Sequence, residues 1–301
     1  MDPSVMVFAP APQLTITVEQ VSDEPELHLH VGGQGIWQAR MIASLGVPAT
    51  VCAVLGGEVG RVLEPLIASE EVTLRAVHRD ADNGWYVHDR RDGERRPIAE
   101  VAGEPLGRHE LDELYDLALT EGLRATVTVL SGPAHPDVVP PDAYRRLATD
   151  LGGNGSRVAA DLSGEHLRAV LHGKPYFVKV SHEELGVEPD DMAGLSRALR
   201  RLRDDGAGAV VVSRAERSAL ALIDDDILEV RMPRLEVTDH RGAGDSMTAG
   251  VVSVLARRGE LADAVKAGAA AGALNVTRHG LGTGRPDAIA ELARRVHLEQ
   301  T

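Results

Sequence analysis

The stretch Arg241-Gly242-Ala243-Gly244-Asp245-Ser246 stands directly before a long alanine-rich segment of helical character, Met247 to Arg258. Glycine, a small residue and glycine at a helix start let backbone N–H groups converge on one point, where the helix dipole adds partial positive charge. The pattern therefore predicts an anion hole formed by Gly242, Ala243 and Gly244, with Asp245 placed to accept a proton from a hydroxyl group. The structural alternative is a tight turn in which Asp245 only caps the helix.

Apolar runs bounded by turns alternate with amphipathic segments along most of the chain. The runs that predict buried strands are Ala49 to Leu55, Thr126 to Leu130, Arg157 to Ala160, Tyr176 to Val180, Ala209 to Val212 and Ala219 to Ile223. The segments that predict helices are Gln38 to Leu45, Arg108 to Thr120, Pro141 to Leu151, Met192 to Asp204, Asp245 to Arg258 and Leu261 to Thr277. Strands and helices in alternation predict an α/β fold with a mostly parallel sheet covered on both faces.

Two stretches break this rhythm. Apolar and polar residues roughly alternate from Leu14 to His30, and the stretch Ala76 to Val101 holds a hairpin signal at Arg91-Asp92-Gly93. We expect both stretches, residues 14–30 and 76–101, to leave the main sheet and pair as a small antiparallel lid. A lid with one apolar face commonly covers a substrate or a second subunit.

The composition is that of a globular protein without a broad basic face. The chain has 301 residues, 43% of them hydrophobic and 26% charged, so it can bury a substantial core. Lys and Arg total 32 against 46 Asp and Glu, and the net charge of −14 argues against nucleic acid as a partner. The single cysteine, Cys52, and the lack of a leader or of an apolar run of about 20 residues predict a cytoplasmic protein without a membrane span.

Several segments, in order, carry a family resemblance. They are Gly32-Gly33-Gln34-Gly35-Ile36-Trp37-Gln38-Ala39 with Leu45-Gly46, then Leu130-Ser131-Gly132, Asp161-Leu162-Ser163-Gly164-Glu165-His166-Leu167, Lys179-Val180-Ser181-His182-Glu183-Glu184-Leu185, and Asp239 to Gly250. With these segments the chain resembles the ribokinase-like (PfkB) family of carbohydrate kinases, nearest the 1-phosphofructokinase and tagatose-6-phosphate kinase branch. The resemblance spans nearly the whole chain and implies one kinase domain over residues 1–301, a three-layer α/β/α sandwich with a β-sheet lid.

The resemblance also implies ATP and Mg²⁺ as cofactors and assigns roles by position. Asp245 becomes the catalytic base, residues 242–244 hold the γ-phosphate of ATP, and Glu184 organises the Mg²⁺ hydration shell through water. On the nucleotide side, the matching positions are Lys179, Ser181, Ser213, Ala215, Arg241, Asn275 and Gly280. Ser181 replaces the asparagine usual in the family, and Ala215 lacks the conformational freedom of the usual glycine.

The substrate side departs from the family pattern. The matching positions are Gln13, Gly32, Gly33, Gln34, Trp37, Trp85 and Ser131. Gln13 replaces an aspartate that binds sugar hydroxyls in the family. Gln34 replaces a lysine, and Trp37 replaces an asparagine. The segment Asn83 to His88 also lacks the arginine that phosphohexose kinases use on the sugar phosphate.

Two interpretations of the tryptophans remain open. They stack on a flat or apolar acceptor group, or they pack lid against lid in a homodimer. We expect an ATP-dependent kinase that acts on a hydroxyl of a sugar or sugar phosphate. The alternatives are a kinase for a nucleoside-like or other non-phosphorylated acceptor, and a non-catalytic protein that binds a nucleotide or metabolite.

Overall fold

The computed structural model describes residues 2–20, 24–233, 235–236, 238, 240–278 and 282–301. The main sheet contains β1 (Val5–Phe8), β4 (Ala49–Gly56), β5 (Thr73–Arg79), β8 (Val127–Ser131), β9 (Arg157–Asp161), β10 (Phe177–Ser181), β11 (Ala209–Arg214), β12 (Arg217–Ile223), β13 (Asp226–Arg231) and β14 (His297–Gln300). The second sheet contains β2 (Gln13–Gln20), β3 (Pro25–Gly32), β6 (Trp85–Asp89) and β7 (Arg96–Val101). The helices are α1 (Gln34–Ser44), α2 (Gly57–Ala68), α3 (Arg108–Arg124), α4 (Pro141–Gly153), α5 (Gly164–Leu171), α6 (Met192–Asp204), α7 (Ala243–Ala256), α8 (Leu261–Asn275) and α9 (Pro286–Ala293).

The main sheet runs in the order β14-β13-β12-β11-β10-β9-β8-β1-β4-β5. All neighbouring strands from β11 to β5 are parallel, whereas β11 to β14 pair antiparallel at one edge. The predicted mostly parallel sheet is therefore confirmed. The strand expected at Ala219 to Ile223 is β12, the first antiparallel strand of that edge.

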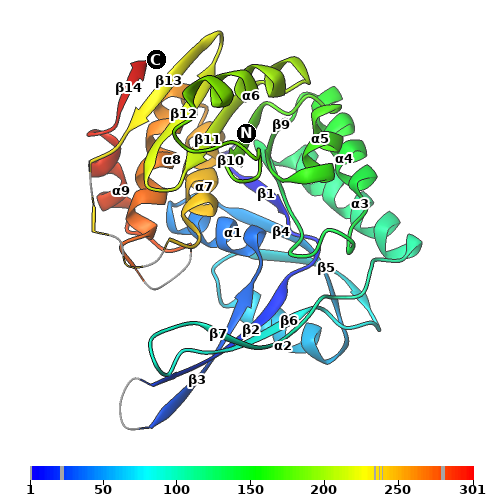
Figure 1. The fold of residues 1–301 in the computed structure, drawn as a ribbon. Coiled ribbons are helices and arrows are strands. Elements are labelled where there is room, and N and C mark those ends of the chain that lie inside the picture. The colour runs from blue at the N-terminus through cyan, green and yellow to red at the C-terminus, as the bar shows by residue number, and fades with distance from the viewer. Residues whose placement is uncertain (1, 21–23, 234, 237, 239, 279–281) are drawn as a thin grey trace.

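Helices cover both faces of the main sheet (Figure 1). One apolar cluster joins the sheet to α1, α2, α7, α8 and α9, and the other joins the opposite face to α3, α4, α5 and α6. Alternate residues of one strand supply the two clusters, as Val129 and Leu130 of β8 do, because side chains alternate across a strand. The result is a three-layer α/β/α sandwich. Among the described residues, no helix has both the length and the apolar character needed to cross a membrane.

The second sheet has the order β3-β2-β6-β7 and extends away from the main body, and we call it the lid (Figure 1). Its strands lie within residues 13–32 and 85–101. β2–β3 and β6–β7 pair antiparallel, but β2 and β6 are parallel, so the expectation of an antiparallel lid is wrong for its central pair. Residues 73–79, part of which we expected in the lid, form β5 instead, paired in parallel with β4. As an edge strand, β5 is half exposed, and its sequence therefore alternates like that of a lid strand.

The order in which the chain adds strands to the main sheet changes direction between β1 and β8. From β1 it proceeds to β4 and β5, then returns to β8 on the other side of β1. In open α/β sheets such a switch point, at the carboxyl ends of the strands, is where ligands bind. The start of α1 sits over this point: a β-carbon built on Gly35 would lie 2.5 Å from the Ala9 β-carbon and 3.2 Å from that of Ser131.

This close approach leads to a prediction about stability. Gly35→Ala should lower the free energy of unfolding by roughly 1–3 kcal/mol, because the new methyl group forces the α1 backbone away from β1. Denaturant titration followed by circular dichroism measures it. Gly153→Ala is the matched control, since a β-carbon there meets nothing within 4 Å at the end of α4. Equal behaviour of the two variants would contradict the packing argument.

Candidate active site

Polar side chains lie in register on three adjacent parallel strands near the switch point, at the last residues of β8 and β9 and in the middle of β10. Ser131 of β8 is in register with Asp161 of β9, which is in register with Lys179 of β10. The residues two positions earlier on these strands belong to the cluster packed on α1, α7 and α8. By strand alternation, the three polar side chains lie on that same face. The sheet thus brings a hydroxyl, a carboxylate and an ammonium group together beside α1 and α7.

Helix α1 presents two glutamines, four residues apart and so on one face, to this end of the sheet. Gln34 Nε2 donates to the backbone oxygen of Asp161 at 3.0 Å, and Gln38 Nε2 donates to Asp161 Oδ2 at 2.9 Å. The oxygen of the Gln38 amide accepts a hydrogen bond from Ser131 Oγ, which turns the amide nitrogen toward the carboxylates. The same nitrogen lies 3.5 Å from Asp245 Oδ1.

The buried carboxylate of Asp161 joins the elements of the site. Thr248 Oγ1 of α7 donates to Asp161 Oδ2 at 2.7 Å, and Lys179 Nζ lies 3.4 Å from Asp161 Oδ1. With the Gln38 contact, this one side chain binds α1, α7 and β10 to the end of β9. A buried charge is tolerated when it is paired and hydrogen-bonded in this way.

The glycine-rich loop begins α7 as the sequence predicts. Gly242, with φ of 67°, is the left-handed residue before the helix, and the helix begins at Ala243. Among the described residues no side chain caps α7, so its first N–H groups are available to an anion. A β-carbon on Gly244 would lie 2.5 Å from Lys179 Nζ, so the lysine ammonium packs directly against the loop.

The pKa values of Asp245 and Lys179 reflect this crowding. Burial, and next the negative charge of Asp161, raise the pKa of the Asp245 carboxyl to about 8, while Lys179 and the Gln38 amide oppose the rise. Burial works against the charged form of Lys179, but Asp161, Glu184 and Asp245 outweigh it, so the pKa of Lys179 is raised overall. Asp245 is therefore a stronger base than an exposed carboxylate. The Lys179 ammonium beside it stays protonated.

Two residues predicted on the nucleotide side, Asn275 and Arg241, are joined to each other. The Asn275 amide donates to the backbone oxygen of Arg241, and its own oxygen accepts from Gly282 N at 3.1 Å. Asn275 is buried and holds the glycine-rich loop to the loop after α8, whereas Arg241 is exposed. Gly280 lies outside the described residues.

Ser181 and Glu184, after β10, form a reciprocal turn. Ser181 N donates to Glu184 Oε2 at 2.6 Å, and Glu184 N donates to Ser181 Oγ at 3.2 Å. The carboxylate is exposed and anchored through one oxygen. Among the described residues there is no cluster of three side chains that could chelate a metal ion. This donor set suits Mg²⁺, which keeps several waters and binds through few carboxylates and substrate phosphates.

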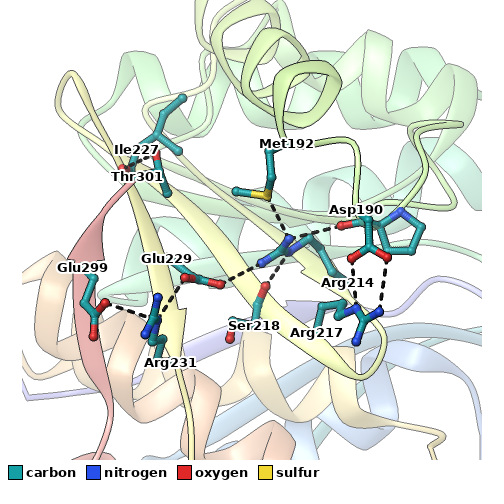
Figure 2. Close-up of polar contacts among 11 residues, drawn as sticks. Asp190, Met192, Arg214, Arg217, Ser218, Ile227, Glu229, Arg231, Glu299 and Thr301 are labelled. Carbon is teal, nitrogen blue, oxygen red and sulfur yellow. Dashed lines mark hydrogen bonds and ion pairs between the residues drawn. The ribbon is translucent and has the colours of Figure 1, made fainter.

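The turn after β11 departs from the expected pattern. Ser213 Oγ donates to the backbone oxygen of Val180 at 3.4 Å, and Ala215 has φ of 50°, a conformation that costs an L-residue about 1–2 kcal/mol. Between them, the side chain of Arg214 is buried on the opposite face of the sheet. It donates to Ser218 and Pro189 backbone oxygens and lies 3.2 Å from Glu229 Oε1 (Figure 2). Arg214 therefore anchors the strained turn from the opposite face of the sheet.

The residues predicted on the substrate side are not all brought together. Ser131 and Gln34 belong to the network described above, and Gly32 and Gly33 connect β3 to α1. Gln13 begins β2, where its amide nitrogen lies against Gly84. The two tryptophans separate: Trp37 is half-buried on α1, whereas Trp85 of β6 packs against the core cluster that includes Leu14 and Val31. Trp85 thus contributes to packing of the lid base.

Sequence reasoning missed three members of the network, namely Gln38, Asp161 and Thr248. The signal for Asp161 was present, because a charged residue that ends a buried apolar strand marks the carboxyl edge of a parallel sheet. Gln38 lies four residues after Gln34 and could have been found as its neighbour on one helix face. Nothing local distinguishes Thr248 within an apolar helix.

Comparison with known proteins agrees with this architecture. The model of the pfkB family of carbohydrate kinases matches residues 4–288. The chain is 31% identical over 260 residues to ATP-dependent 6-phosphofructokinase isozyme 2 of Escherichia coli strain K12, with 83% of this chain and 82% of that protein covered. It is 25% identical over 256 residues to 1-phosphofructokinase of Bacillus subtilis strain 168, with 84% and 83% covered.

Solved structures match over almost the full length. The tetrameric inhibited form of phosphofructokinase-2 from Escherichia coli has a TM-score of 0.83 at 27% identity, with 97% of this chain and 98% of that one covered. Ribokinase of Arabidopsis thaliana, complexed with ribose and ATP, has a TM-score of 0.74 at 19% identity, with 98% and 99% covered. The fold is therefore ribokinase-like, as the sequence resemblance implied. By the extent of the family match, the chain belongs to the pfkB family of carbohydrate kinases, enzymes that transfer a phosphoryl group from ATP.

Proposed function

We propose that this protein transfers the γ-phosphoryl group of ATP to a hydroxyl group of a sugar or sugar phosphate, with Asp245 as the base. One observation carries the proposal. The Asp245 carboxyl, in the first turn of α7, has a raised pKa. Its charged neighbours are Asp161 and the Lys179 ammonium, which packs on the glycine-rich loop. A proton acceptor and an anion-binding loop at one place are what phosphoryl transfer to an alcohol requires.

In the proposed reaction, the acceptor oxygen attacks the γ-phosphorus, the bond from that phosphorus to the bridging oxygen of ADP breaks, and ADP leaves. The hydroxyl proton passes to Asp245. The N–H groups of residues 242–244 and the Lys179 ammonium stabilise the phosphoryl oxygens. Such a base contributes about 10²- to 10⁴-fold in rate, and each preorganised donor about 2.7–4 kcal/mol.

The nucleotide is proposed to lie between Ser213, at the end of β11, and the loop that Asn275 holds after α8. Glu184 is the residue that we assign to Mg²⁺, through water. When bound, the ion would neutralise part of the phosphate charge. Lys179 and the loop act on the oxygens that the ion leaves free.

One contact of the lid supports a role in closing the site. His135 Nε2, in the loop after β8, lies 3.2 Å from Glu100 Oε1 of β7, so one lid strand reaches the main body beside the site. Closure of such a lid excludes water and limits hydrolysis of ATP.

We also infer that a second copy of this chain covers the outer part of the apolar lid face, where Leu27, Leu29 and Val101 are 63%, 44% and 45% exposed.

Replacement of the base tests the proposed reaction. Asp245→Asn should lower acceptor-dependent ADP release about 10²- to 10⁴-fold, because the amide cannot take the hydroxyl proton. Calorimetry should show ATP binding within a few-fold of the wild type. Asp263→Asn, the same change at an exposed position of α8, is the control and should retain activity. Normal turnover by Asp245→Asn would refute the assignment of the base, and a protein that binds ATP without any turnover would favour the non-catalytic alternative.

The same variant tests the electrostatic cost of the site. Since the pKa of Asp245 is raised from 3.8 to about 8 in the folded protein, the protonated form is favoured by folding, and wild-type stability falls as pH rises through that range. An asparagine stays neutral. Its stabilising effect should be absent near pH 4 and grow by up to about 1.4 kcal/mol for each pH unit between pH 4 and pH 8. Thermal or urea unfolding at both pH values measures it; a gain that is independent of pH would show that burial of the charge is not the cause.

The proposed dimer is tested by sedimentation. The double variant Leu27→Lys and Leu29→Lys should sediment as a monomer at concentrations where the wild type is a dimer, because two buried charges would oppose lid-to-lid contact. Leu123→Lys, on α3 and also exposed in one chain, is the control and should leave the dimer intact. A monomeric wild type at high concentration would exclude this use of the lid.

A further inference from the structure

A cavity adjoins the switch point of the main sheet. It has a volume of about 780 Å³ and lies between the start of α1, the loop that follows β8 and the start of α5. Gln34 lines it, and the amide of that residue bonds the backbone of Asp161, whose carboxylate neighbours Asp245. The cavity therefore adjoins the hydrogen-bonded network around Asp245, although neither Asp245 nor the glycine-rich loop lines it.

The charged residues of this cavity all carry one sign. Asp137, Glu165 and Glu184 line it, and among the described residues of its wall there is no lysine or arginine. Most of the remaining wall is proline, glycine and apolar side chains. If Glu184 is set aside for a magnesium ion, Asp137 and Glu165 remain, and Arg168, the cation beside Glu165, lies outside the wall. Proteins recognise phosphate esters with Arg, Lys and clusters of N–H groups, so this wall has the wrong charge for one.

Three positive or basic features near the cavity already have partners. The N-terminus of α5 points partial positive charge toward it, but Glu165 stands in the first turn of that helix. Arg168, one turn later on α5, lies 3.6 Å from the Glu165 carboxylate and does not line the wall. His166, the remaining basic residue of the wall, is buried with Nε2 bonded to the Val139 backbone oxygen at 2.7 Å.

The cations of the neighbouring elements have other partners. Arg79, near the lid base, donates to the backbone oxygens of Pro105 and Glu104. Arg95 of the lid lies over the Tyr86 ring and 3.2 Å from His88 Nδ1, and Arg90 is paired with Glu19. Lys179 packs against Gly244, at the glycine-rich loop. No side chain among these is directed at the cavity by the contacts that it makes.

From this charge pattern we propose that the acceptor is an uncharged polyhydroxyl compound, a free sugar or sugar-like polyol, and not a phosphate monoester. The inference rests on the proposed function, since it concerns the acceptor of that reaction. A phosphate dianion placed in this cavity would meet carboxylates and lose its hydration without gaining a cation. A neutral sugar keeps most of its hydrogen bonding on entering the cavity. The Gln34 amide, the carboxylates and backbone groups replace the water partners of its hydroxyl groups.

Matched pairs of acceptors test the proposal. ADP release would be measured with fructose beside fructose 1-phosphate and fructose 6-phosphate, and with ribose, glucose and tagatose each beside its own monophosphate. We expect kcat/KM for the best neutral acceptor to exceed that of its phosphate ester by roughly tenfold to a hundredfold, the discrimination that like charges at close range produce. A higher kcat/KM for the phosphate ester of the best pair would overturn the proposal and leave the proposed function intact.

A charge added to the wall provides the second arm. Gln34→Lys keeps a donor of similar reach for the Asp161 backbone and should raise kcat/KM for the phosphate esters about tenfold, with no gain for the neutral sugars. Glu165→Gln, which removes one carboxylate without touching α1, should move the ratio in the same direction. Gln300→Lys, the same substitution on β14 far from the cavity, should leave the ratio unchanged.

The outcomes separate the two proposals. If neither lining variant improves the phosphate esters while the wild type already favours them, the charge of the wall does not select the acceptor. If no sugar or sugar phosphate releases ADP although ATP binds in calorimetry, the proposed function itself fails, and the acceptor class fails with it.

Discussion

The buried carboxylate of Asp161 is the group on which the rest of the site depends. It accepts hydrogen bonds from Gln38 and Thr248 and pairs with Lys179, and so α1, α7 and β10 meet at one point at the end of β9. A carboxylate buried to this degree is stable only if its partners remain in place. The same contacts position the neighbours of Asp245, because Gln38 and Lys179 each face both aspartates. The geometry of the proposed base is thus determined by a residue that need not touch the acceptor.

The charges of the site serve chemistry at a cost to the fold. Two carboxylates and an ammonium group share a small volume, and the pKa of Asp245 rises because the second negative charge is poorly solvated there. A raised pKa makes the carboxylate a better proton acceptor near neutral pH, while its ionised form destabilises the folded state. The acceptor cavity continues this negative field through Asp137 and Glu165, whereas the positive charge of Lys179 is concentrated at the glycine-rich loop. In the proposed reaction, phosphate binding and acceptor binding would therefore be separated by charge within a short distance.

Local patterns predicted most of the architecture. The alternation of apolar runs and amphipathic segments indicated the parallel sheet with helices on both faces, and the two irregular stretches indicated the second sheet. The patterns missed the twelve-residue helix Gly57–Ala68, and they also failed where elements were short or at an edge. The strand at Val5–Phe8 and the helix at Gly164–Leu171 were too short to show periodicity, and the edge strand at Thr73–Arg79 had the half-exposed alternation of a lid strand. Trp85 was predicted on the substrate side or in a lid-to-lid contact, and on β6 it is partly buried against the core cluster.

The sequence by itself determined the glycine-rich turn before α7, the aspartate in its first turn and the polar residues that end the buried strands, because these depend on residues close together in the chain. Only the tertiary structure decided which of these groups meet. The approach of α1 to β1 and β8 at Gly35 brings Gln38 to a carboxylate 123 residues away, and strand register brings Asp161 to Lys179. The negative charge of the cavity wall was equally invisible, since its carboxylates come from three segments that are far apart in the chain. Contacts of this kind follow from long-range packing, which no local periodicity encodes.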